Sequence, residues 1–162
     1  MPVHAFVGVA DAVNRYLVHA RYVHRDAAPQ LMVPALRGIW AGAARRDTSA
    51  LIGTLLACDW YLLDPATTVG EDTPVDCARR RPGIGLTSAV LTGTHPAAGS
   101  DPEWMFPLSR AGDFDGDWTY LLHPDLHIVS VHTGDGEPRG AYPLSGARPR
   151  RRRPAPRPAA AR

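Results

Sequence analysis

The sequence contains no lysine, and all 18 of its basic Lys/Arg positions are arginine. A phosphate-binding P-loop of the Walker type needs a lysine and is therefore excluded. The same absence, beside abundant alanine, arginine, proline and glycine, is typical of a GC-rich bacterial genome. Coding bias therefore accounts for part of the arginine content, and no single arginine is strong evidence of function on its own.

Cysteine and long apolar runs are also scarce. The two cysteines, Cys58 and Cys77, form no C-x-x-C pair that could begin a zinc site, and we expect two reduced thiols. The longest apolar stretch, residues 50–58, falls far short of the roughly 20 residues that cross a bilayer. The first residues lack the basic start and apolar run of a secretory signal. We expect a soluble, cytoplasmic protein that does not bind membranes.

Charge is distributed unevenly along the chain. Residues 148–162 carry seven arginines and no acid, whereas residues 1–147 carry eleven arginines against sixteen Asp and Glu, a net charge of −5. The overall charge of +2 therefore combines an acidic body with a basic end. We expect residues 1–147 to form one globular domain and residues 148–162, rich in Arg, Pro and Ala, to form a flexible tail.

Apolar spacing predicts helices in the first third. Residues 9–24 show an i, i+3, i+4, i+7 pattern, and residues 34–45 show a second one that begins at a proline. A third helix is predicted to begin near Asp47, which is a good N-cap residue, and to end before Asp64.

Strand signals dominate the rest. Residues 118–123 and 126–133 are rich in aromatic and β-branched residues and flank a Pro-Asp turn, which predicts a hairpin. Residues 86–94 and 104–108 are two further strand candidates. Helices followed by strands favour an α+β fold, with an N-terminal helical layer packed on a small antiparallel sheet and a disordered C-terminal tail.

Histidines and a carboxylate near the predicted hairpin are the candidate metal ligands. They are His123, Asp125, His127 and His132. Side chains of these types bind zinc when they converge, and such a site would support a metal-dependent hydrolase. The Pro-Asp turn redirects the chain between the first two histidines, so a polar turn on the wet side of a hairpin is the competing interpretation.

Clustered arginines are the candidate anion or nucleic-acid contacts. Arg79, Arg80 and Arg81 precede a glycine-rich stretch whose backbone amides could form an anion-binding nest. Arg150, Arg151, Arg152 and Arg153 lie in the basic end, where seven positive charges would bind phosphate backbones through counterion release. A solvated surface loop and a solvated chain end are the alternatives.

No complete catalytic set is visible, so we lean against an enzyme and expect no cofactor. The leading hypothesis is a small binding or accessory module that acts through protein–protein contacts. It predicts an exposed apolar patch that includes one or two of the four tryptophans. The alternatives are a nucleic-acid-associated protein that uses the basic tail and the metal-dependent hydrolase.

Overall fold

A β-hairpin, not a helix, begins the described part of the chain. In the computed structural model, strands β1 (Ala5–Ala10) and β2 (Leu17–Val23) pair antiparallel. The helical prediction for residues 9–24 was wrong. Leu17, Ala20 and Val23 of the predicted apolar face lie in β2, and Val13 and Tyr16 lie in the connecting loop. Because β2 packs against clusters on both faces of the sheet, its apolar residues do not show a simple alternation.

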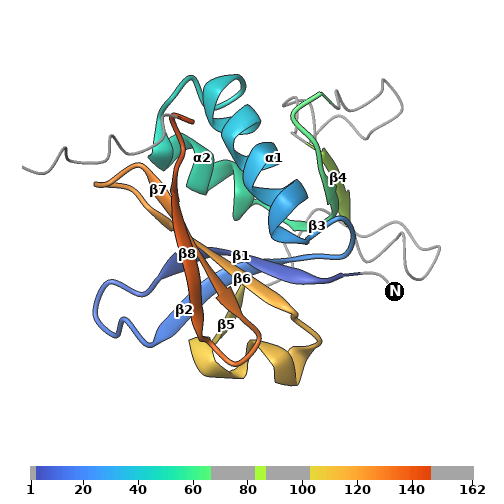
Figure 1. Cartoon of the computed structure of the whole chain (residues 1–162), viewed down its shortest axis with the longest axis vertical. Coiled ribbons are helices and arrows are strands. Elements are labelled where there is room, and N and C mark those ends of the chain that lie inside the picture. The colour runs from blue at the N-terminus through green and yellow to red at the C-terminus, as the bar shows by residue number, and fades with distance from the viewer. Residues whose placement is uncertain (1–2, 67–82, 87–102, 147–162) are drawn as a thin grey trace, which may run out of the picture.

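The structure describes residues 3–66, 83–86 and 103–146. Two α-helices and three strands follow the hairpin, and the last three strands come after a 3₁₀ helix (Figure 1). After β2 the elements are α1 (Pro29–Ala41), α2 (Thr48–Leu55), β3 (Asp59–Leu63), β4 (Gly83–Leu86), β5 (Trp104–Pro107), the 3₁₀ helix η2 (Leu108–Phe114), β6 (Trp118–His123), β7 (Ile128–Thr133) and β8 (Pro138–Pro143).

These strands form one mixed sheet in the order β4-β3-β2-β1-β6-β7-β8, with β5 paired to β2 beside β3. β1 runs parallel to β6 and β2 runs parallel to β3, while the other pairs are antiparallel. The expected small antiparallel sheet beneath an N-terminal helical layer is therefore incorrect. Pairing between β1 and β6 joins segments more than a hundred residues apart, which a local pattern does not reveal.

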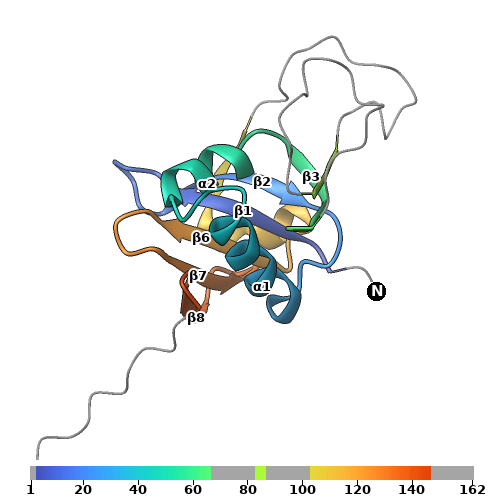
Figure 2. The same cartoon turned by 90° about the horizontal axis from the view of Figure 1, so that it is seen from above.

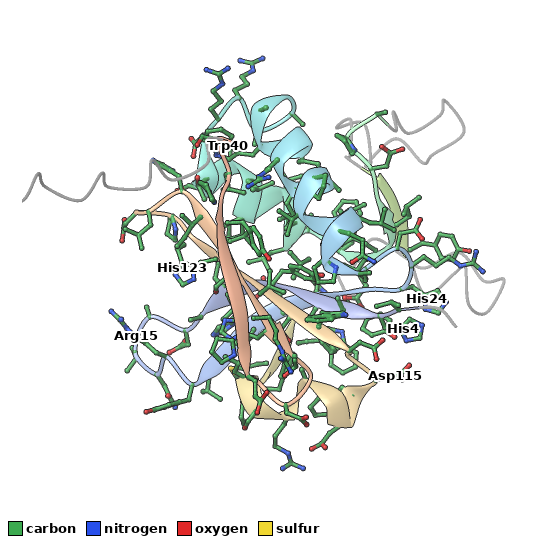
Figure 3. The ribbon with its side chains drawn as sticks, viewed as in Figure 1. His4, Arg15, His24, Trp40, Asp115 and His123 are labelled. Carbon is green, nitrogen blue, oxygen red and sulfur yellow. The ribbon has the colours of Figure 1, made fainter. Side chains whose placement is uncertain are left out.

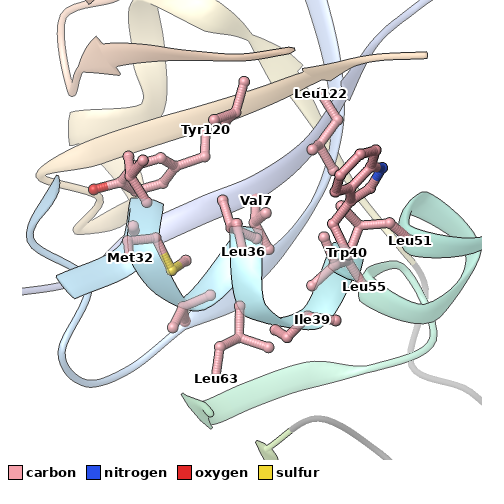
Figure 4. Packing of buried hydrophobic residues seen from close by; sticks show 14 of the residues in the cluster. Val7, Met32, Leu36, Ile39, Trp40, Leu51, Leu55, Leu63, Tyr120 and Leu122 are labelled. Carbon is pink, nitrogen blue, oxygen red and sulfur yellow. The ribbon is translucent and has the colours of Figure 1, made fainter. Parts of the chain in front are cut away.

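Both faces of the sheet are covered (Figure 1). On one face, Leu36 from α1 and Leu51 and Leu55 from α2 lie in one cluster with Tyr120 from β6, and all four are fully buried (Figure 4). The other face carries a smaller cluster under β5 and η2, made of Phe6, Val18, Ala20, Phe106, Ala111 and Leu121. The central strands are therefore fixed on two sides.

The second and third predicted helices form with shifted ends, and the last part of the third prediction is wrong, because α2 ends at Leu55 and residues 59–63 form β3. α2 begins where predicted, because the Asp47 carboxylate accepts hydrogen bonds from the amides of Ser49 and Ala50 at 2.8 and 3.1 Å. α1 begins at Pro29 and continues through Pro34, the residue expected to start it. Among the described residues, no helix combines the length and apolar composition needed to cross a membrane.

The later strands match the predictions most closely. The β6–β7 hairpin is confirmed, and β5 ends at the expected Pro107. Residues 87–94 of the candidate strand 86–94 lie outside the described residues, as does Cys77.

Candidate functional site

The loop between β1 and β2 is held by its own polar side chains. The Asp11 carboxylate oxygen Oδ1 accepts hydrogen bonds from the backbone amides of Val13 and Asn14 at 2.9 and 2.7 Å. The side-chain oxygen of Asn14 accepts one from the amide of Tyr16 at 3.1 Å. Backbone bonds from Asp11 to Leu17 and from Leu17 to Asn14, both 2.9 Å, close the loop. These contacts give it a defined shape without any partner.

This ordered loop exposes large apolar side chains. The side chain of Val13 is 96% exposed and that of Tyr16 is 82% exposed. Arg15 lies between them, is also exposed, and makes no ion pair with a carboxylate in the described part of the chain. The hydrogen bonds of the loop thus keep the side chains of Val13, Arg15 and Tyr16 exposed to solvent.

The turn between β6 and β7 lies at the same end of the sheet. Because β1 and β6 run parallel, with Gly8 opposite Leu121, the segments that follow them emerge together (Figures 1 and 2). Leu126 in the second turn is 65% exposed. His123 closes β6 between the two loops (Figure 3). We call Val13, Arg15, Tyr16, His123 and Leu126 the end surface.

A serine hydroxyl lies between two imidazoles beside this surface. The Ser130 Oγ is 2.8 Å from Nε2 of His123 and 3.1 Å from Nε2 of His132, and all three side chains are partly buried. They share one face of β6 and β7. The other ring nitrogen of His132 lies 3.3 Å from the carbonyl oxygen of Gly136. This network fixes the ring of His123 at the edge of the end surface.

Burial lowers the pKa of His123, and the nearby His132 and Arg15 lower it further. The imidazole is therefore neutral at neutral pH. A neutral ring can share the Ser130 hydroxyl as donor or acceptor, so the network is intact under those conditions.

The lowered pKa of His123 predicts a pH dependence of stability. As pH falls, His123 is protonated in the unfolded chain before it is protonated in the folded chain. The contribution of neutral His123 to the free energy of unfolding is therefore full above about pH 6.5 and is lost below it. We expect the urea midpoint to drop more between about pH 7.5 and 5 in the native protein than in His123→Gln. Equal drops in both proteins would contradict this role.

Asp11 controls the loop. Hydrogen bonds from the Asn14 amide, from His19 and from the Val13 amide lower the pKa of its carboxyl group. The ionised carboxylate therefore contributes to the stability of the fold above about pH 4, and this contribution is lost as pH falls further.

We expect Asp11→Ala to speed hydrogen exchange at the amides of Val13 and Asn14 by about tenfold, since each loses its acceptor. Exchange measured by NMR tests this. Asp11→Asn, which keeps an acceptor oxygen, should show a smaller change, and unchanged exchange in Asp11→Ala would show that the loop is held by other contacts.

The structure separates the four candidate metal ligands. His123 and His132 meet at Ser130, but His127 lies in the β6–β7 turn at φ +51°, where its Nδ1 is 2.7 Å from Thr48 Oγ1. Asp125 is exposed. Within residues 3–66, 83–86 and 103–146, no group of three His, Cys, Asp or Glu side chains is placed to hold a metal ion.

The remaining predictions can be compared with the structure only where their residues are described. Arg79–Arg81 and Arg150–Arg153 lie outside the described residues. Trp60 is fully buried and Trp40 is 8% exposed, whereas Trp104 on β5 is 38% exposed and contacts the rings of Phe6 and Phe114. Trp104, the most exposed of these three tryptophans, is not part of the end surface.

Among the described residues, the Ser130 network lacks one part of a serine nucleophile site. A serine nucleophile needs a base that a third group orients, usually a carboxylate. In the described part of the chain, neither His123 nor His132 is hydrogen-bonded to a carboxylate. The chain matches no protein-family model, no curated protein and no solved structure. Function therefore has to be argued from the site itself.

Proposed function

We propose that this protein is a binding module that recognises a protein partner through the end surface. One observation carries the proposal. The three most exposed large hydrophobic side chains of the described residues, Val13, Tyr16 and Leu126, all lie on two loops at one end of the sheet. Scattered exposed apolar residues need no explanation, but apolar residues gathered on ordered loops mark interaction sites.

Residue chemistry supports this role. Tyrosine and arginine are enriched among the residues that dominate binding energy, and Tyr16 lies next to Arg15. Tyrosine buries a large rigid area at a low cost in side-chain entropy.

The ordered loop supports it as well. Asp11 and Asn14 already fix its backbone in the free protein, so little backbone entropy remains to be lost on binding.

The free edge of β8 is less suited to a partner strand. Proline stands at both ends of this strand, Pro138 and Pro143, and proline cannot donate a backbone hydrogen bond to an added strand. β8 is also only six residues long. Recognition through side chains on the end surface is therefore favoured over strand addition.

Site-directed photo-crosslinking in the native cell tests the proposal. A benzophenone amino acid placed at Tyr16 should give one discrete adduct with another protein after irradiation. The matched control is Leu31 on α1, an apolar side chain that is 51% exposed but not on the end surface. Adducts of equal yield at both positions, or none at Tyr16, would contradict the proposed surface.

A further inference from the structure

A pocket of about 390 Å³ opens beside the C-terminal end of α1. The residues that line it include Arg37, Trp40, Arg46 and Leu144, together with Gly38 and Gly146. The volume falls within the range of about 300–1,000 Å³ that small-molecule sites occupy. Figure 3 shows Trp40 at this end of the helix, and Figure 4 shows its ring close to Leu51. The end surface contributes no residue to this pocket.

The turn that follows α1 places an arginine among the residues that line this pocket. Arg45 and Arg46 adopt left-handed backbone angles, with φ of +51° and +64°. Two successive non-glycine residues in this region cost roughly 1–3 kcal/mol each. The backbone amide of Arg46 donates to the carbonyl of Trp40 at 2.7 Å, and the amide of Gly42 donates to that of Gly38 at 3.0 Å. These bonds satisfy the helix end and hold the strained turn.

Two arginines, Arg37 and Arg46, are among the residues that line the pocket, and none of its described lining residues is acidic. Arg37 donates its Nε to the carbonyl of Pro143 at 2.9 Å, which positions its terminal nitrogens, and neither arginine forms an ion pair in the described part of the chain. Trp40 is held in place because its Nε1 donates to Thr48 Oγ1 at 3.1 Å. Arg37 and Trp40 are therefore held in place, and Arg46 beside them is exposed.

We propose that this pocket binds a small oxyanion, a carboxylate or a phosphate, carried on a flat apolar body. The guanidinium groups of Arg37 and Arg46 would hold the oxyanion, since arginine matches the geometry of carboxylate and phosphate. The exposed edge of Trp40 would contact the apolar part. The combination of an apolar wall with a few polar groups is the usual composition of a ligand pocket.

Titration of the full chain with benzoate and with phenyl phosphate, followed by NMR at the indole N–H of Trp40, tests this proposal. We expect saturable shifts with a dissociation constant on the order of 1 mM for the better probe. The two probes distinguish the anion class. Benzyl alcohol, which is neutral and of similar shape, should bind at least tenfold more weakly, because it offers no charge to the guanidinium groups.

The chain contains a matched control for the arginine. We expect Arg46→Gln to weaken binding of the better probe by at least tenfold, whereas Arg45→Gln, which changes the adjacent exposed arginine outside the pocket, should change it less than twofold. Thermal melts of both variants verify that they are folded. Equal losses in the two variants, equal affinity for benzyl alcohol, or no saturable shift with either anion would overturn the proposal. Arg37→Gln gives an independent second test, with the same tenfold loss expected.

Discussion

Replacing Val13 and Tyr16 together with serine is expected to weaken partner binding by roughly 100-fold or more, about 3 kcal/mol. Both side chains are almost fully exposed in the free protein, so the substitution removes contact area that only a partner would cover. The loop backbone should keep its shape, because its hydrogen bonds come from Asp11 and Asn14. Isothermal titration with the crosslinked partner, once purified, measures the loss.

Stability separates this effect from unfolding. The double variant should unfold within about 0.5 kcal/mol of the native protein, as is usual for surface substitutions. Leu31→Ser is the matched control, because it also removes an exposed apolar side chain, and it should leave affinity unchanged. Wild-type affinity in the loop variant would remove Val13 and Tyr16 from the recognition surface.

The second large effect is expected for a substitution in β1, the strand that precedes the loop with Val13 and Tyr16. Gly8→Ala should destabilise the fold by more than about 3 kcal/mol, beyond the usual cost of overpacking. A Cβ atom at Gly8 would lie 1.9 Å from the carbonyl oxygen of His19 and 2.7 Å from the Cα of Ala20, both in the backbone of β2. Neither atom can rotate away, so β1 and β2 would have to separate. Chemical denaturation measures the change.

Another glycine of the same chain is the control. Gly53 lies exposed in α2, and a Cβ atom there would meet nothing within 4 Å. Alanine is the better helix former, so Gly53→Ala should stabilise the protein by about 0.5–1 kcal/mol. If Gly8→Ala proved as harmless as Gly53→Ala, the close pairing of β1 and β2 described here would be incorrect.

The sequence predicted the elements that are specified by residues close together in the chain. Asp47 caps α2 because its carboxylate reaches amides two and three residues ahead, and the β6–β7 hairpin follows from strand-forming residues on either side of a turn. The β1–β2 hairpin was missed because β2 carries apolar residues on both faces, with Val23 in one cluster and Val18 and Ala20 in the other, which hides the alternation of a strand. The parallel pairing of β1 with β6 depends on contacts between distant segments, which have no periodic signal.

Only part of the candidate site could be predicted from residues close together in the sequence. Asp11 and Asn14 are turn-forming residues, and their spacing could have indicated a loop where a helix was expected. The meeting of His123 and His132 at Ser130 depends on the hairpin register, which sets Ser130 opposite Leu121. The turn residue His127 has a positive φ angle and faces Thr48 instead. The pocket beside α1 needs Leu144 to return to the helix, and no local pattern predicts that contact.

Hydrogen exchange of the protein with and without its crosslinked partner tests the end surface most directly. Binding through this surface predicts slower exchange at the amides of residues 13–16 and at Leu126, with little change in β8. Protection confined to β8, or to the area around Trp104 and Phe114, with residues 13–16 unchanged, would contradict the account.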